Sequence, residues 1–508
     1  MNRPAGRSAP VHTLGVLDAG WLLLESASNL MHGGILCVFD PPPDAGPRFV
    51  HHLVDDMRRY TTPVVPFNRK LKRSGLGRLW PQWETVDHID PDRHVYHYAL
   101  PALGDERDLG VLISQLQGIA LNKADPLWTF HVIEGLPDGR FAIFGRMHHA
   151  LADGVAALGF VDAWLSDDPA SRDMPPMWAA SLRRNRSRPT SDPHTPKPGW
   201  SGRGLPAVVE AAARMPADAL AMIGDLRTTP RRMVGAVRAV YRAAGGVSAR
   251  PWSAPRTTIN TPITAHRRVA TESYDLGRFS ALAERAGGTI NDVVLAMCSG
   301  GLRRYLADVG TLPTQPLITN IPVSVRRVNK TREAGNSISW AMVSLATDVD
   351  DVRQRFDTIR SATGQAKKRL QQLGDTIDTY TLLVTTPILL EQVVGLGGHL
   401  PPMFNIPISN VPGPRTAKYL NGARLREIYA LTVLYGGQAL NTVAVSYAGW
   451  LNFSFTACGD SLPHVQRLAV FCREALEELE QTYATEPDPS RRGRARRPRK
   501  SNGHNATP

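Results

Sequence analysis

A stretch rich in proline, arginine, serine and aspartate, Asp167 to Gly204, divides the chain into two flanks of domain size. It contains the runs RRNRSRP and DPHTPKPGW, a composition typical of linkers and long surface loops. The chain has 508 residues, which is more than a single hydrophobic core usually serves. Both flanks mix short alternating strands with helical segments. The sequence therefore predicts two domains joined by a long connection.

We divide the chain into five segments on this basis. Residues 1–13 form an N-terminal extension, and residues 14–167 form the first domain. Residues 168–261 are the proline- and arginine-rich linker, followed by a helical crossover. Residues 262–485 form the second domain, and residues 486–508 are a basic disordered tail.

The tail carries much of the positive charge. The formal net charge is +13, and the run RRGRARRPRK at Arg491–Lys500 holds seven cations. Such a run is either a solvated end of the chain or a segment that attracts an anionic surface, for which lipid head groups fit better than nucleic acid. The sequence shows neither an RNA-binding aromatic motif nor a helix-turn-helix with base-reading residues, so we expect no nucleic-acid partner.

Cysteine usage and the apolar runs favour a cytoplasmic protein. The four cysteines lie far apart without a CxxC pair, which predicts neither a disulfide framework nor a zinc site. The N-terminus has arginines but lacks the apolar region of a signal peptide. No apolar run reaches the roughly 20 residues of a membrane-spanning helix. We therefore expect a protein that is soluble or bound peripherally to the inner membrane face or to lipid droplets.

The clearest motif follows a predicted hairpin. Strands over Trp128 to Leu136 and Arg140 to Met147 are joined by a Pro-Asp-Gly turn, and Asp-Gly between two apolar runs favours a hairpin. The second strand leads into the sequence HHALADG at 148–154, which has the pattern HHxxxDG. Catalytic groups often lie where a chain leaves a sheet in this way.

The residue types of this motif suit acyl transfer to an alcohol. That reaction needs a base near neutral pH to take the hydroxyl proton, and histidine is the side chain whose ordinary pKa fits. The candidates are His148 and His149. Asp153 can orient the neighbouring backbone or pair with an arginine, and Gly154 permits a tight turn or a close approach.

The histidine pair has other interpretations. Adjacent histidines can bind a metal, but no third histidine or cysteine lies at metal-ligand spacing, so we expect no metal there. The pair can also be buried structural residues. A serine hydrolase would need a sequence such as GxSxG, which the chain lacks.

HHxxxDG resembles the signature of the coenzyme A-dependent acyltransferase superfamily, which includes chloramphenicol acetyltransferase and the condensation domains of peptide synthetases. Further segments resemble the bacterial wax ester synthase/diacylglycerol acyltransferase family. These segments are Leu17-Asp18-Ala19 with Trp21-Leu22 and Glu25, Met31-His32-Gly33-Gly34, Asp125-Pro126-Leu127-Trp128, Asn291-Asp292, Pro322-Val323-Ser324-Val325-Arg326 with Gly335-Asn336, and Ser409-Asn410-Val411-Pro412-Gly413-Pro414.

The resemblance implies an α/β fold of two chloramphenicol-acetyltransferase-like domains, each a sheet flanked by helices, with an active-site channel between them. It assigns the general base to His149, with His148, Asp153 and Gly154 as supporting residues. Asp153 would shape the loop rather than touch substrate. The other candidates for substrate binding or support are Trp128, Asn291, Asp292, Ser324, Arg326 and Asn336.

Several of these candidates also have structural interpretations. Thr289 and Asp292 are spaced as a capping box, so Asp292 can simply stabilise the start of a helix. Trp128 can be an ordinary core residue. Ser324 and Asn336 can donate a hydrogen bond to the oxyanion of a tetrahedral intermediate, or can fix the end of a strand.

The resemblance implies an O-acyltransferase without a bound cofactor. It would move a long-chain fatty acyl group from acyl-CoA, its co-substrate, to the hydroxyl of diacylglycerol, and also to long-chain alcohols. Its partner surface would be an anionic membrane or a lipid droplet. Two alternatives stay open: a condensation-type enzyme whose acyl donors are bound to a carrier protein, and a non-catalytic protein that binds lipid or coats droplets.

Overall fold

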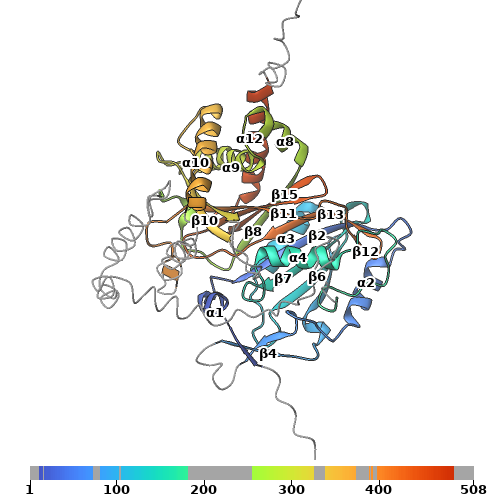
Figure 1. Ribbon diagram of the computed structural model, residues 1–508. Coiled ribbons are helices and arrows are strands. Elements are labelled where there is room, and N and C mark those ends of the chain that lie inside the picture. The colour runs from blue at the N-terminus through green and yellow to red at the C-terminus, as the bar shows by residue number, and fades with distance from the viewer. Residues whose placement is uncertain are drawn as a thin grey trace, which may run out of the picture.

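The computed structural model contains two large sheets and one small sheet, with helices packed on their faces (Figure 1). Most of the N-terminal extension, most of the linker and crossover, and the basic tail lie outside the described residues, as do Arg326 and Asn336. The structure describes residues 11–14, 16–72, 81–101, 104–180, 254–324, 338–372, 388, 391–392 and 397–484.

The first large sheet is built mainly from the N-terminal half of the chain. Its order is β12 (Tyr419–Leu420), β13 (Ala423–Leu431), β2 (His32–Asp40), β7 (Phe141–His148), β6 (Trp128–Glu134) and β5 (Val95–Ala99). Neighbouring strands are antiparallel, except that β5 runs parallel to β6. The central pair of β2 and β7 places His32 opposite His148.

The second large sheet comes entirely from the C-terminal half. Its order is β10 (Ile338–Ser344), β9 (Ile318–Ser324), β11 (Ile406–Pro412), β14 (Leu440–Tyr447), β15 (Trp450–Cys458) and β8 (Arg267–Asp275). Strand β11 runs parallel to both of its neighbours, whereas the other pairs are antiparallel. A small sheet of β1 (Val11–Thr13), β4 (Gln82–Thr85) and β3 (Arg69–Leu71) lies beside the first large sheet.

A hairpin from the C-terminal half completes the first sheet. Strands β12 and β13 belong by sequence to the second flank, yet β13 pairs along its length with β2. The same hairpin also contacts the second sheet, since the hydroxyl of Tyr447 on β14 donates to the carbonyl oxygen of Leu425 over 2.8 Å. The hairpin thus contacts both large sheets, and the bounds 14–167 and 262–485 stay a prediction.

Helices cover both faces of the first sheet. Helices α2 (Phe49–Arg58) and α4 (Gly154–Trp164) pack on one face, in a common core with Trp128 and Ile143. Helix α3 (Glu106–Gln117) packs on the opposite face and reaches the second sheet. There the backbone N–H of Val269 on β8 donates to Ser114 Oγ of α3 over 3.0 Å. Helix α3 therefore lies between the two sheets.

Four helices pack together on the second sheet, at the top of Figure 1. They are α8 (Leu276–Arg285), α9 (Ile290–Asp308), α10 (Val352–Gln372) and α12 (Val465–Ala484). Helix α9 contacts the other three, and its approach to α12 requires a glycine. A Cβ at Gly301 would lie 2.4 Å from Cys472 Sγ, which no side chain tolerates without a shift.

The structure confirms the α/β class, with sheets flanked by helices, and several local predictions. The predicted hairpin is β6 and β7, joined by a turn over Pro137–Gly139 in which Asp138 has φ 60°. The predicted capping box of Thr289 and Asp292 opens α9. The remaining short elements are α1 (Val16–Leu24) and the 3-10 turns Pro91–Arg93 and Thr258–Asn260. Within the described residues, no helix is both long and apolar enough to cross a membrane.

Candidate active site

The backbone of the histidine pair is held from both sides. Strand β7 ends at His148, whose N–H donates to the carbonyl oxygen of Leu127 over 2.9 Å. The next N–H, that of His149, donates to the carbonyl oxygen of Met31 over 2.8 Å. Leu127 precedes β6 and Met31 precedes β2, the two strands that flank β7. The point where the pair leaves the sheet is therefore fixed.

The end of the motif starts helix α4. Asp153 is the N-cap residue, and its Oδ1 accepts from the N–H of Ala156 over 2.8 Å. The carboxylate thus shapes the turn that presents His149. Gly154, the first residue of the helix, is not among the described glycines with a positive φ. A Cβ there would meet no atom within 4 Å, so the space beside this residue is open.

The imidazole of His149 is partly buried against Trp21 of α1. Their ring centroids lie 4.2 Å apart, with the planes inclined by 32°. Within the described residues, Nδ1 of His149 is buried and has no hydrogen-bond partner. Burial lowers the pKa of His149, and the Asp153 carboxylate opposes that decrease. The ring is therefore neutral at pH 7 and able to accept a proton, as a general base requires.

His148 has a different environment and cannot share this role. Its side chain is fully buried, and Nδ1 accepts from the N–H of Ala150 over 3.1 Å. Its Nε2 lies 3.7 Å from Oε1 of Glu25, whose other oxygen is 2.6 Å from Lys123 Nζ. Burial, together with the nearby His149 and Lys123, lowers the pKa of His148 to about 3. His148 is thus a neutral residue that supports the loop.

The N-terminal stretches that resemble the family, Leu17–Glu25 and Met31–Gly34, form one wall of this site. Trp21 supports the His149 ring, Glu25 faces His148, and Met31 holds the His149 backbone. Sequence reasoning assigned none of these residues a role. A signal was present, because Trp21 and Glu25 are four residues apart and so lie on one side of a helical turn.

Trp128 lies in the core of the first domain. Its side chain is 1% exposed, its Nε1 donates to the carbonyl oxygen of Phe67 over 2.7 Å, and its ring stacks on Trp178. Within the described residues, no hydrogen bond or ring contact joins Trp128 to His149. Its neighbour Leu127 supplies the carbonyl oxygen that holds His148. The Pro-Leu-Trp segment thus contributes to the site through its backbone.

Asp292 is engaged at the start of α9. Its Oδ2 accepts from the N–H and the hydroxyl of Thr289 over 2.8 and 2.7 Å, and its Oδ1 accepts from Thr363 Oγ1 of α10 over 2.6 Å. Asn291 is partly buried on the same turn. Neither residue has a described interaction with the histidine loop. Ser324 ends β9 opposite Ile338, and its side chain is not described.

Two surface cavities in the described part of the chain lie away from His148 and His149. One follows the exposed side of α10, and the other lies between α2 and the segment 172–173. Because neither is lined by His149, the expected channel between the domains stays a prediction.

Solved structures of similar architecture define the class of protein. The wax ester synthase/diacylglycerol acyltransferase from Marinobacter aquaeolei superposes with a TM-score of 0.73 and 31% sequence identity, over 93% of this chain and 100% of that one. The first condensation domain of the calcium-dependent antibiotic synthetase superposes with a TM-score of 0.51 at 16% identity, over 94% and 97% of the two chains, which shows a shared fold alone. The fold and the histidine loop together are those of an acyltransferase.

Sequence comparison then gives the family. Residues 14–294 match the wax ester synthase/diacylglycerol acyltransferase catalytic domain, and residues 334–480 match the WS/DGAT C-terminal domain. A "probable" diacylglycerol O-acyltransferase of Mycobacterium tuberculosis is 37% identical, over 91% of this chain and 98% of the relative. The O-acyltransferase WSD of Acinetobacter baylyi is 35% identical, over 94% and 98%. The chain belongs to the wax ester synthase/diacylglycerol acyltransferase family, which confirms the resemblance stated above.

Proposed function

We propose that this acyltransferase moves a long-chain fatty acyl group from acyl-CoA to the hydroxyl of diacylglycerol, and also to long-chain alcohols. The observation that carries the proposal is the state of His149: a neutral imidazole that lies against Trp21 at the point where β7 leaves the sheet. The names of relatives in Mycobacterium and Acinetobacter support the acceptor and the reaction. No bound cofactor takes part in the proposed mechanism.

In the proposed mechanism His149 acts twice. It takes the proton of the acceptor hydroxyl as that oxygen attacks the thioester carbonyl carbon, and a tetrahedral oxyanion forms. The oxyanion then collapses, the carbon–sulfur bond breaks, and the imidazolium returns its proton to the departing thiolate. The Asp153 carboxylate favours the imidazolium, because its charge raises the pKa of His149. Ester and free coenzyme A leave in equal amounts.

A long acyl chain is favoured on energetic grounds. Each methylene group that leaves water contributes about 0.8 kcal/mol to binding. An apolar tunnel therefore discriminates strongly between a fatty donor and an acetyl donor. Diacylglycerol and fatty alcohols are apolar as well, so the acceptor would arrive from a lipid surface.

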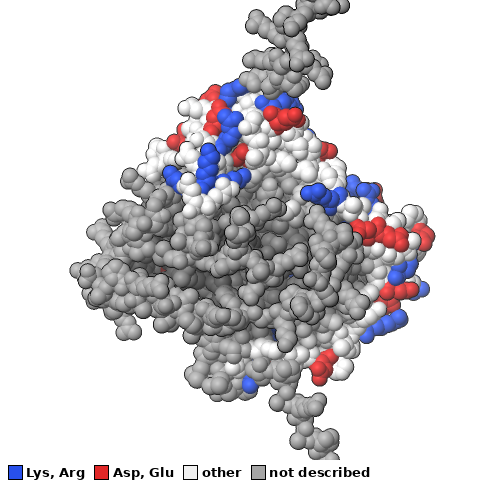
Figure 2. Space-filling model, viewed as in Figure 1, with Lys and Arg blue, Asp and Glu red and all other residues white. Residues whose placement is uncertain are grey.

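We propose that the basic tail brings the enzyme to an anionic membrane or droplet surface. The run Arg491–Lys500 holds seven cations, and each contributes about 1 kcal/mol near an anionic surface. Basic and acidic side chains are interspersed on the described part of the face shown in Figure 2. Deletion of residues 486–508 is expected to abolish co-flotation with phosphatidylserine vesicles. Unchanged flotation would refute this role.

Release of free thiol from palmitoyl-CoA tests the chemistry. The purified protein is assayed with diacylglycerol, with hexadecanol or with no acceptor. We expect acceptor-dependent release that falls by about 10²- to 10⁴-fold in His149→Ala, the usual contribution of a general base. The matched control is His52→Ala, which removes an exposed histidine of α2. Release that survives in His149→Ala would refute the mechanism, and release from carrier-bound donors alone would favour the condensation-type alternative.

A further inference from the structure

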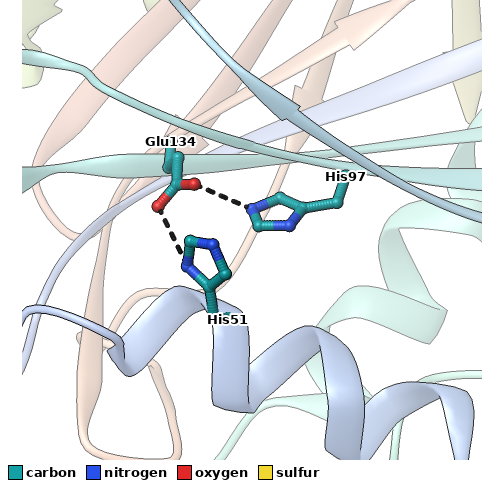
Figure 3. Close-up of side chains that lie close together, drawn as sticks. All are labelled: His51, His97 and Glu134. Atoms are coloured by element: carbon teal, nitrogen blue, oxygen red, sulfur yellow. Dashed lines mark ion pairs between the residues drawn. The ribbon is translucent and has the colours of Figure 1, made fainter.

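A second group of histidine and carboxylate side chains lies at the other end of β6 from Trp128. His51 comes from α2, His97 from the edge strand β5, and Glu134 from the end of β6 (Figure 3). His51 and His97 are 46 positions apart in sequence, and His97 and Glu134 are 37 positions apart. No local motif therefore marks the group. Glu134 lies six positions along β6 from Trp128, which pairs with Met147 beside the histidine loop, so the group is about 20 Å from that loop.

The three side chains converge on one point. Nε2 of His97 lies 3.2 Å from Oε1 of Glu134, and Nδ1 of His51 lies 3.7 Å from Oε2. One ligand atom from each residue lies within 4.8 Å of the others. In Figure 3 both rings turn a nitrogen toward the carboxylate between them. Ligand atoms around a tetrahedral zinc ion, with bonds of about 2.0–2.1 Å, lie about 3.3 Å apart.

The contacts within this group leave a polar atom unsatisfied. Nε2 of His97 is buried and forms no hydrogen bond of good geometry within the described residues, although a carboxylate oxygen is 3.2 Å away. The approach is therefore not aligned for a proton between the two atoms. A metal ion between the imidazole nitrogen and the carboxylate oxygen would bind both atoms.

We propose that His51, His97 and Glu134 bind a Zn²⁺ ion, with water completing its coordination. Two imidazoles and one carboxylate form a ligand set that suits zinc, whereas magnesium and calcium prefer oxygen ligands. The side chains of His97 and Glu134 are 21% and 24% exposed and that of His51 is 54% exposed, so an ion can enter from solvent. The positive charge of Arg58 nearby opposes binding in part.

The site would fasten a helix to a sheet edge. Strand β5 has a single neighbour in the sheet, and α2 packs beside it. A metal ion shared by α2, β5 and β6 would hold these three elements together independently of acyl transfer. This inference therefore goes beyond the proposed function, and each can fail without the other.

Zinc titration of the full-length, untagged protein tests the site. After treatment with a chelator, the protein is titrated with ZnCl₂ by calorimetry, and with CoCl₂ while the visible absorption of the cobalt ion is recorded. We expect one site in the unaltered protein and in the control His52→Gln, an exposed neighbour outside the group. We expect at least tenfold weaker binding, and loss of the cobalt absorption, in His51→Gln and Glu134→Gln.

The choice of His51 keeps the test decisive, because this exposed side chain on the surface of α2 can be replaced without disturbing the core. Magnesium chloride serves as a hard-cation control and is expected to give no heat of binding. The melting temperature is expected to rise with zinc in the unaltered protein and in His52→Gln alone. Equal zinc affinity in all variants, or no binding with zinc in tenfold excess over protein, would overturn the proposal.

Discussion

The indole of Trp21 lies against the imidazole of His149, with 4.2 Å between the ring centroids. The contact joins α1, near the N-terminus, to the turn after β7. It supports the imidazole that we propose as the general base, whose Nδ1 has no hydrogen-bond partner within the described residues.

This contact predicts a positioning role for Trp21. An aromatic contact contributes about 0.5–1.5 kcal/mol beyond the area that it buries. If that energy holds the imidazole in its reactive orientation, Trp21→Ala should lower kcat by about two- to tenfold, and Trp21→Phe should restore most of it. Steady-state kinetics on proteins with matched melting curves would measure the effect. An unchanged kcat in Trp21→Ala would mean that the indole does not orient the ring.

The pH dependence of the reaction follows from the pKa of His149. Burial holds this pKa below its ordinary value of 6.5, and the ring must be neutral to act as a base. Activity should therefore persist as the pH falls below 6.5 and disappear as the pH passes through the lowered pKa. Asp153→Asn keeps an acceptor for the N-cap but removes the charge that raises this pKa. The acidic limb of kcat/KM should then move to lower pH, and a shift to higher pH would contradict the assignment.

Glu25, which is paired with Lys123, lies beside the imidazole of His148. The Glu25 side chain is 4% exposed, and Lys123 Nζ lies 2.6 Å from it. Lys123→Met would leave a buried carboxylate without its cation. We expect the free energy of unfolding to fall by about 1–3 kcal/mol, toward the lower end because Lys123 is itself half-exposed. In urea unfolding, the double variant Glu25→Gln/Lys123→Met should recover part of the free energy of unfolding that Lys123→Met loses. A loss equal to the sum of the losses in the two single variants would argue against coupling.

Local patterns predicted the parts of this structure that depend on neighbouring residues. The hairpin of β6 and β7 follows from an Asp-Gly turn between apolar runs, and the capping box of Thr289 and Asp292 from their spacing. The histidine motif was found for the same reason, since its members lie within seven consecutive positions.

Long-range pairing accounts for what the sequence did not predict. The pairing of β13 with β2 joins residues almost 400 positions apart, such as Arg424 and Asp40. No pattern in either segment indicates which strand it pairs with. The contact of Trp21 with His149 and the group of His51, His97 and Glu134 depend on the same assembly. Each becomes visible when the sheet order is known.

Asp292 allows structural and catalytic roles to be separated. Its carboxylate closes the capping box with Thr289 and also accepts from Thr363 of α10, so it fastens two helices of the second domain. Asp292→Ala removes both interactions and should lower the free energy of unfolding by about 1–3 kcal/mol. Asp292→Asn keeps one of the two acceptor oxygens and should lose less. We expect kcat, measured below the melting transition, to change less than threefold in both variants, because the lost hydrogen bonds stabilise the fold. A hundredfold loss of kcat in Asp292→Asn, with stability retained, would instead require the carboxylate in the reaction.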